Sequence, residues 1–223
     1  WYICFPEETE NGLELPDVIY VYSSSVSNVL KQYYKKTGLY LGCSTRYAYW
    51  KDVDRCQKER QYYLFVGALA GFDNDVLIAT LQRLLRNSTE AIPVMLRLHP
   101  FAELSYGVRR WLRSSLDKGD ICISKGDSSL VADLESATVV IGMSTTVLEE
   151  ALLLGRQVIQ LQHPDYREFI DVSGVEGVMK RDYRTLLAKD LIDASTLKVD
   201  HMEMRMRLGL QNEIIDYKRL FAW

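Results

Sequence analysis

The sequence predicts an α/β protein whose core is a parallel β-sheet with helices on its faces. Between residues 61 and 161, short runs of β-branched and aromatic residues alternate five times with segments of helical periodicity or their connecting loops. Glycine, proline and serine residues separate these segments, as expected of loops. Such alternation is typical of right-handed β-α-β units, in which successive strands lie parallel.

A less regular region precedes this alternation. Asp17–Tyr22 (DVIYVY) is a predicted strand, Val26–Tyr34 has the apolar spacing of a helix, and Leu39–Leu41 is a further short strand. Residues Thr45–Arg60 are charged and lose apolar periodicity. We therefore expect a linker at this point of the chain.

The regular region itself predicts five strands and four helices. The strands are Tyr62–Gly67, Val94–Leu98, Ile121–Ser124, Thr138–Ile141 and Gln157–Leu161. The helices are Val76–Leu85, Leu104–Leu116, Leu130–Ser136 and Val147–Leu154, the last ended by Gly155. Helical periodicity returns at Tyr183–Leu191 and Met202–Leu220, where we expect helices that cover a sheet edge or lead to another domain.

The composition narrows the function classes. With 223 residues, of which 48% are hydrophobic, the chain can bury a substantial core. The net charge is −3 and the basic residues are scattered, which argues against nucleic acid as a partner. The four cysteines lie far apart, as in a reduced, cytoplasmic protein. No apolar run reaches the roughly 20 residues of a transmembrane helix, so peripheral attachment to the inner face of a membrane would involve another part of the full-length protein.

One predicted loop combines small residues with hydroxyls at the start of a helix. It runs from Gly142 through Met143, Ser144 and Thr145 to Thr146. Free backbone N–H groups, the helix dipole and the hydroxyls together suit a phosphate group without Lys or Arg. Alternatively, Thr146 and Glu149 form an ordinary capping box. The residues alone do not choose between the two.

Histidine follows two of the predicted strands. His99-Pro100 closes the strand Val94–Leu98, where an imidazole can donate to a phosphate or to a hydroxyl of a ligand. We interpret His163-Pro164 as a turn and His201 as a solvent-facing helical residue.

A further loop, GALAGFDND, follows the first strand of the regular region. Its Gly67 and Gly71 permit close approach of a ligand to the backbone, but the loop lacks the spacing of a dinucleotide fingerprint. Asp73 and Asp75 are candidates for a metal site or an acid/base pair, and more readily cap the helix expected near Val76. No cluster has convincing metal spacing, so we predict no metal.

Several of these features occur in an order and spacing that resemble the C-terminal, donor-binding domain of GT-B glycosyltransferases. They are His99-Pro100, Gly142-x-Ser144-Thr145-Thr146, Glu149-Glu150-Ala151-Leu152 and Gly155-x-x-Val158-Ile159. In motif style the chain looks most like bacterial sialyl- and Kdo-type transferases and CDP-glycerol glycerophosphotransferases, and UDP-GlcNAc 2-epimerases share the architecture. The resemblance is good over Gln61–Leu161 and looser elsewhere.

The resemblance implies a Rossmann-like sheet and a division of the chain. Residues 1–55 would be the end of a preceding GT-B domain with its linker, and residues 56–223 the nucleotide-sugar-binding domain with terminal helices. The sequence begins with Trp1 rather than with an initiator Met, and apolar residues follow directly. We therefore expect it to be a fragment of a longer chain.

The resemblance also assigns roles to residues. His99 would act in catalysis by contacting the phosphate or sugar of the donor, and Ser144, Thr145 and Thr146 would bind the donor's phosphates. The remaining binding residues would be Gly142 and Gly67 where the backbone approaches the donor, Glu150 at the ribose hydroxyls, and Ser124 with Lys125 near the nucleobase. No cofactor is implied beyond the donor, which in the most similar families is linked to CMP or CDP.

The function implied is transfer of a sugar or glycerol phosphate to a saccharide or lipid-linked acceptor in bacterial surface polysaccharide or glycolipid synthesis. The base that activates the acceptor would belong to the preceding domain. Two alternatives remain: a nucleotide-sugar epimerase of the same fold, and a nucleotide-binding or assembly module without catalysis.

Overall fold

The computed structural model of the chain describes residues 18–21, 27, 30–31, 34–35, 37–42, 47, 50, 59–124, 129–165 and 170–210. The chain forms two compact units. The larger unit comprises residues 54–201, and the smaller one combines residues 1–53 with residues 202–223.

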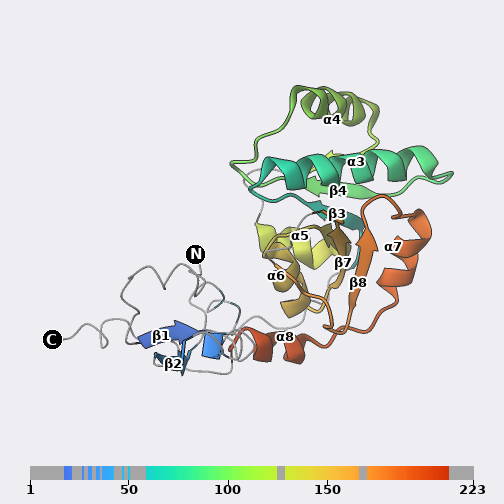
Figure 1. Ribbon diagram of the computed structural model, residues 1–223. Coiled ribbons are helices and arrows are strands. Elements are labelled where there is room, and N and C mark those ends of the chain that lie inside the picture. The colour runs from blue at the N-terminus through green and yellow to red at the C-terminus, as the bar shows by residue number, and fades with distance from the viewer. Residues whose placement is uncertain are drawn as a thin grey trace. The chain divides into compact units, whose positions relative to one another are not determined.

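The larger unit contains one six-stranded sheet in which every pair of neighbouring strands is parallel (Figure 1). The strands are β3 (Tyr62–Val66), β4 (Val94–Arg97), β5 (Cys122–Ile123), β6 (Ala137–Gly142), β7 (Gln157–Gln162) and β8 (Val178–Asp182). Their order is β5-β4-β3-β6-β7-β8. The chain thus builds outward from β3 in one direction and then returns to build outward from β6 in the other, which is the doubly wound Rossmann order.

Helices cover both faces of this sheet. They are α3 (Gly71–Asn87), α4 (Tyr106–Lys118), α5 (Leu130–Ser136), α6 (Val147–Leu153) and α7 (Ala188–Ser195). The helices α3 and α7 contribute to the same hydrophobic cluster, whereas α5 and α6 lie on the opposite side of the strands (Figure 1). This division follows from right-handed crossovers that run in opposite directions from the two central strands.

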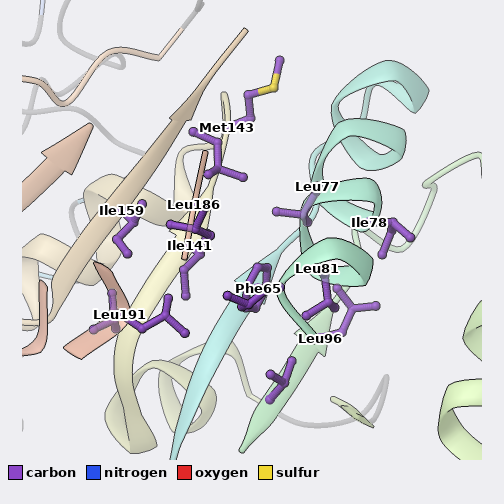
Figure 2. Close-up of a cluster of buried hydrophobic side chains, with 14 of the residues drawn as sticks. Phe65, Leu77, Ile78, Leu81, Leu96, Ile141, Met143, Ile159, Leu186 and Leu191 are labelled. Carbon is purple, nitrogen blue, oxygen red and sulfur yellow. The ribbon is translucent and has the colours of Figure 1, made fainter. Parts of the chain in front are cut away.

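The core of the larger unit lies between the central strands and α3. Phe65 of β3 and Ile141 of β6 are fully buried against Leu77 and Leu81 of α3, as Figure 2 shows. The spacing of Leu77 and Leu81 places both side chains on one face of the helix. The largely apolar sequences of β3 and β6 are the pattern expected of strands covered on both faces.

The smaller unit contains two parallel strands, β1 (Val18–Val21) and β2 (Gly38–Leu41), and the helix α8 (His201–Arg207). Tyr20 and Tyr40 are cross-strand partners, and their rings stack with centroids 5.6 Å apart. Within the described residues no helix has the length and hydropathy needed to cross a membrane.

Each predicted strand is present, with small differences at its ends, and the fold class is confirmed, but α3 begins earlier than predicted. It starts at Gly71, because the buried side chain of Asn74 donates to the backbone carbonyls of Ala68 and Ala70 and so fixes the turn before the helix. Asp73 and Asp75 therefore lie inside the helix. The prediction that they cap it is wrong.

Two later elements also differ from prediction. The helix expected from Tyr183 starts only at Ala188, because Asp182 accepts from the N–H of Arg184 and Asp190 accepts from the N–H of Leu187, which holds a turn. The strand β8 was missed, because its second half is charged. Charged residues are common on edge strands, and β8 is an edge strand in this sheet.

The last predicted helix is shorter than expected. It runs from His201 to Arg207, and Gly209 then takes a left-handed φ of 66°, which ends it. The rest of the predicted range, residues 211–220, lies outside the described part of the chain. Of the helix predicted at Val26–Tyr34, the described residues Ser27, Leu30 and Lys31 are helical.

Candidate functional site

The central strands β3 and β6 form the switch point of the sheet, and most of the predicted binding residues follow them. Gly67 comes directly after β3, Gly142 is the last residue of β6, and Ser144 to Thr146 connect β6 to α6. The chain leaves β3 toward one face and β6 toward the other. In sheets of this kind the crevice between two such loops is the usual place for a ligand.

The two glycines are required by close packing. A Cβ atom at Gly142 would lie 2.9 Å from Val66 Cγ2 of the neighbouring strand and 3.1 Å from Leu148 Cδ2 of α6. A Cβ atom at Gly67 would lie 2.5 Å from Asn74 Oδ1, which accepts from the N–H of Ala68 at 3.0 Å. Glycine thus allows both loops to leave the sheet close to the neighbouring strand and helix.

The start of α6 does not contain the ordinary capping box that was the alternative interpretation. Thr146 occupies the N-cap position with helical backbone angles, and its side chain accepts no capping hydrogen bond. The N–H of Val147 is instead 3.4 Å from Thr145 Oγ1. The prediction of a Thr146–Glu149 box is therefore wrong, while the interpretation of this turn as an anion site stays open.

The hydroxyl of Ser144 contacts a segment that the sequence did not associate with it. Ser144 Oγ accepts from the N–H of Ile170 at 3.0 Å. In the same region, the side chain of Gln160 in β7 bonds to the backbones of Met143, Ile170 and Val172. Gln160 was missed because a glutamine within an apolar strand carries no motif.

Glu150 lies in the first turn of α6 and is 4% exposed. A buried carboxylate close to a helix N-terminus is favoured by the helix dipole. Its contact with a ribose stays a prediction, as do the roles of the other residues of this loop.

The predicted catalytic histidine lies one strand away from the switch point. His99 follows β4, is half-buried, and accepts from the N–H of Phe101 through Nδ1 at 3.2 Å. The order β4-β3-β6 places β3 between His99 and the loop after β6. His99 therefore lies at the same edge of the sheet as Ser144, with β3 between their strands, and its role stays a prediction.

A second histidine contacts aromatic rings at the same edge. His163 follows β7, and its ring stacks on Tyr183 at 4.9 Å and meets Phe72 edge-on at 5.1 Å. Beside Tyr183, Arg184 forms a bidentate pair with Asp182, and these hydrogen bonds lower the pKa of Asp182 to about 2. His163 opens a turn as predicted, but its aromatic contacts were not foreseen.

Ser124 belongs to a polar network at the end of β5, and its position near a nucleobase stays a prediction. It accepts from Arg97 at 2.9 Å and donates to Asp133, and Arg97 also pairs with Asp133. Tyr62 donates to the backbone of Asp133 at 3.1 Å; burial, and then the charge of Asp133, raise the pKa of its phenol. Lys125 lies outside the described residues.

Two further features bear on the choice of site. Among the residues that the structure describes, no group of three or more His, Cys, Asp and Glu could hold a metal ion. A hollow of about 650 Å³ lies at the opposite edge of the sheet, where Val94 and Cys122 begin their strands and Trp111 and Lys118 of α4 line the wall. None of the predicted site residues lines it.

Comparison with known proteins identifies solved structures that share this architecture. No protein-family model and no curated protein matches the sequence. Among solved structures, the UDP-GlcNAc 2-epimerase of Methanocaldococcus jannaschii in complex with UDP-GlcNAc and UDP is similar with a TM-score of 0.54 and 13% identity, over 87% of this chain and 59% of that chain.

Two other solved structures are similar at the same level. A putative UDP-N-acetylglucosamine 2-epimerase from Listeria monocytogenes has a TM-score of 0.51 and 15% identity, over 88% of this chain and 54% of that one. A mutant of S. aureus TarM in complex with fondaparinux, α-GlcNAc-glycerol and UDP has a TM-score of 0.50 and 10% identity, over 87% and 39% of the two chains.

These likenesses show the fold. The larger unit has the Rossmann-like architecture of the GT-B enzymes, as the resemblance implied. The chain spans between 39% and 59% of the length of the three proteins named.

Proposed function

We propose that this chain is the donor-binding half of a GT-B glycosyltransferase, and that it holds a nucleotide-activated donor at the switch point between β3 and β6. The full-length protein would transfer a sugar or glycerol phosphate to a saccharide or lipid-linked acceptor at the cytoplasmic side of a bacterial membrane. The similar epimerase and the TarM mutant were both solved with UDP, which supports a nucleotide in this fold.

The observation that carries this proposal is the construction of the loop after β6. Gly142 allows it to pack against β3, Thr145 Oγ1 rather than Thr146 lies within 3.4 Å of the N–H of Val147, and the side chain of Gln160 bonds to the carbonyl of Met143. A helix dipole and hydroxyl groups fixed in this way are suited to an anionic phosphate.

The chemistry follows from the charge that develops during transfer. Cleavage of the bond between the transferred group and the phosphate leaves additional negative charge on the nucleotide. The α6 amides and the hydroxyls of Ser144, Thr145 and Thr146 would stabilise that charge, and His99 would contact the phosphate or the transferred group from the end of β4. Glu150 would accept hydrogen bonds from the ribose.

Calorimetric titration with CMP, CDP, UDP and GDP tests this proposal. We expect one nucleotide to bind with a submillimolar Kd, on the order of −4 kcal/mol or better. The double variant Ser144→Ala, Glu150→Gln should weaken that binding at least about tenfold. The matched variant Ser114→Ala, Glu90→Gln, which makes the same chemical changes away from the switch point, should bind like the parent. Equal affinities of the two variants would contradict the site.

An epimerase is the second candidate, favoured by the higher TM-scores of the two epimerase structures. The two functions differ in their need for an acceptor. An epimerase changes the sugar of UDP-GlcNAc without any acceptor, whereas a transferase without acceptor gives slow hydrolysis at most. Analysis of the sugar after incubation of the full-length protein with donor alone separates them.

A further inference from the structure

One polar side chain interrupts the apolar core of β7. Gln160 has 0% of its surface exposed, and its strand neighbours Ile159 and Leu161 are equally buried. An amide without hydrogen bonds at such a position would cost about 1–3 kcal/mol, and an aliphatic side chain would avoid that cost. Gln160 therefore needs an explanation beyond packing.

Both ends of the Gln160 amide are used. Nε2 donates to the backbone carbonyls of Met143 at 3.2 Å and Ile170 at 2.6 Å, and Oε1 accepts from the N–H of Val172 at 3.1 Å. Rotating the amide would place its NH₂ against the N–H of Val172 and its oxygen against two carbonyls, so the orientation is fixed by its partners.

These bonds connect two stretches of backbone that are far apart in the chain. Met143 begins the loop after β6, and Ile170 to Val172, which we name the wall segment, lies between β7 and β8. The bond from Ile170 N–H to Ser144 is a second link between the same two stretches. Hydrogen bonds through Gln160 and through Ser144 therefore join the wall segment to the loop after β6 at two adjacent points.

We infer that Gln160 is a positioning residue of the nucleotide site, which makes the wall segment respond to occupancy of the loop after β6. This inference rests on the proposed function. A phosphate on the loop restrains Met143 and Ser144, and the shared bonds of Gln160 pass that restraint to Ile170 and Val172. The wall segment thereby becomes part of the donor site, although it lies outside the motifs that define the loop.

The same strand supplies a control residue. Gln157 is also buried, with 5% of its surface exposed, and its Nε2 donates to a single backbone carbonyl, that of Leu197, at 2.8 Å. Gln157 lies at the opposite end of β7 from the loop. Replacing either glutamine by methionine keeps the volume and removes the amide.

The test is amide hydrogen exchange of the wall segment, followed by NMR with and without saturating UDP or CDP. In the parent protein we expect the nucleotide to slow exchange at Val172 at least about fivefold, because a restrained segment opens less often. Gln160→Met should abolish that slowing and raise the Kd about tenfold. Gln157→Met should preserve both the slowing and the affinity, even if it lowers the thermal stability by a similar amount.

The outcomes separate this inference from the proposed function. If the parent protein binds none of CMP, CDP, UDP and GDP, the proposed function fails and the inference fails with it. If the parent binds a nucleotide while exchange at Ile170 and Val172 is unchanged, the inference alone is overturned, whatever the variants do. Equal behaviour of the two methionine variants would also overturn it, because general destabilisation would then explain the effect of Gln160.

Discussion

The two halves of the sheet use buried polar groups differently at the carboxyl edge. In the β4–β5 half, Arg97, Ser124 and Asp133 bond to one another. In the β6–β7 half, Gln160 and Ser144 bond to the backbone of the chain segments that follow the strands. The bonds named in the first arrangement join side chains to one another, and those in the second join side chains to loop backbone.

We expect this difference to separate stability from binding. Removing the bonds among the side chains of Arg97, Ser124 and Asp133 should lower stability without selective loss of binding. Side chains that hold loop backbone in place should affect binding more than stability when they are removed. Among the residues that the structure describes, Gln160 and Ser144 hold backbone in this way beside the loop after β6.

The largest expected effect follows from the loss of Asp133. Asp133→Ala removes a charged partner of the partly buried Arg97, so we expect the free energy of unfolding to fall by about 3 kcal/mol. Urea denaturation measures this loss, and the exposed Asp193→Ala serves as the control, with an expected change below about 0.5 kcal/mol. A loss below about 1 kcal/mol for Asp133→Ala would show that the bonds of Asp133 are dispensable.

The next effect concerns the packing of the loop after β6. Gly142→Ala places a methyl group against Val66 and Leu148, and we expect overpacking to cost about 2 kcal/mol. Gly107→Ala in α4 is the matched control, because nothing lies within 4 Å of the added atom. That change should stabilise the protein by up to about 1 kcal/mol. Thermal unfolding of the two variants compares them, and similar shifts of Tm would contradict the close packing.

A smaller effect is expected when two of the predicted site residues, Ser144 and His99, are replaced and compared. Ser144→Ala should raise the Kd of the nucleotide about tenfold, equivalent to ~1.4 kcal/mol, because it removes a hydroxyl from the loop and the acceptor of Ile170. His99→Ala should raise that Kd no more than about threefold, because β3 separates His99 from the loop. Calorimetry with the nucleotide alone measures both. A larger effect of His99 would move the site toward β4.

The smallest effect lies at the end of β8. Because Arg184 holds the pKa of Asp182 at about 2, below its ordinary value of 3.8, Arg184→Gln should raise that pKa toward the ordinary value. The contribution to stability is present above the ordinary pKa and is lost as the pH falls through about 2. NMR titration of the Asp182 carboxyl carbon detects the shift. An unchanged pKa would show that Arg184 does not hold Asp182.

Much of the fold was predictable because apolar periodicity reports burial. The central strands β3 and β6 are covered on both faces, and their sequences are largely apolar. The edge strand β8 was missed because its sequence, VMKRD, gives no such pattern. The start of α7 was misplaced because the hydrogen bonds of Asp182 and Asp190 overrode the helical periodicity before Ala188.

The residues of the candidate site could be predicted only where the small and hydroxyl-bearing residues of a loop indicate ligand binding. Gly142 and Ser144 follow a central strand and stand out by their spacing. Gln160 and Asn74 act through side-chain-to-backbone bonds that no spacing reveals, although Gln160 is an amide between the apolar residues Ile159 and Leu161. An unexpected amide in a predicted core strand is therefore the signal that would have identified Gln160.

The most direct test of the central claim is to map the contact site of the bound nucleotide by NMR chemical-shift perturbation. We expect UDP or CDP to shift the amides of Gly67, Ser144, Thr145 and the wall segment, at the carboxyl edge of the sheet. Shifts concentrated instead at Trp111 and Cys122, in the hollow at the opposite edge, would contradict it.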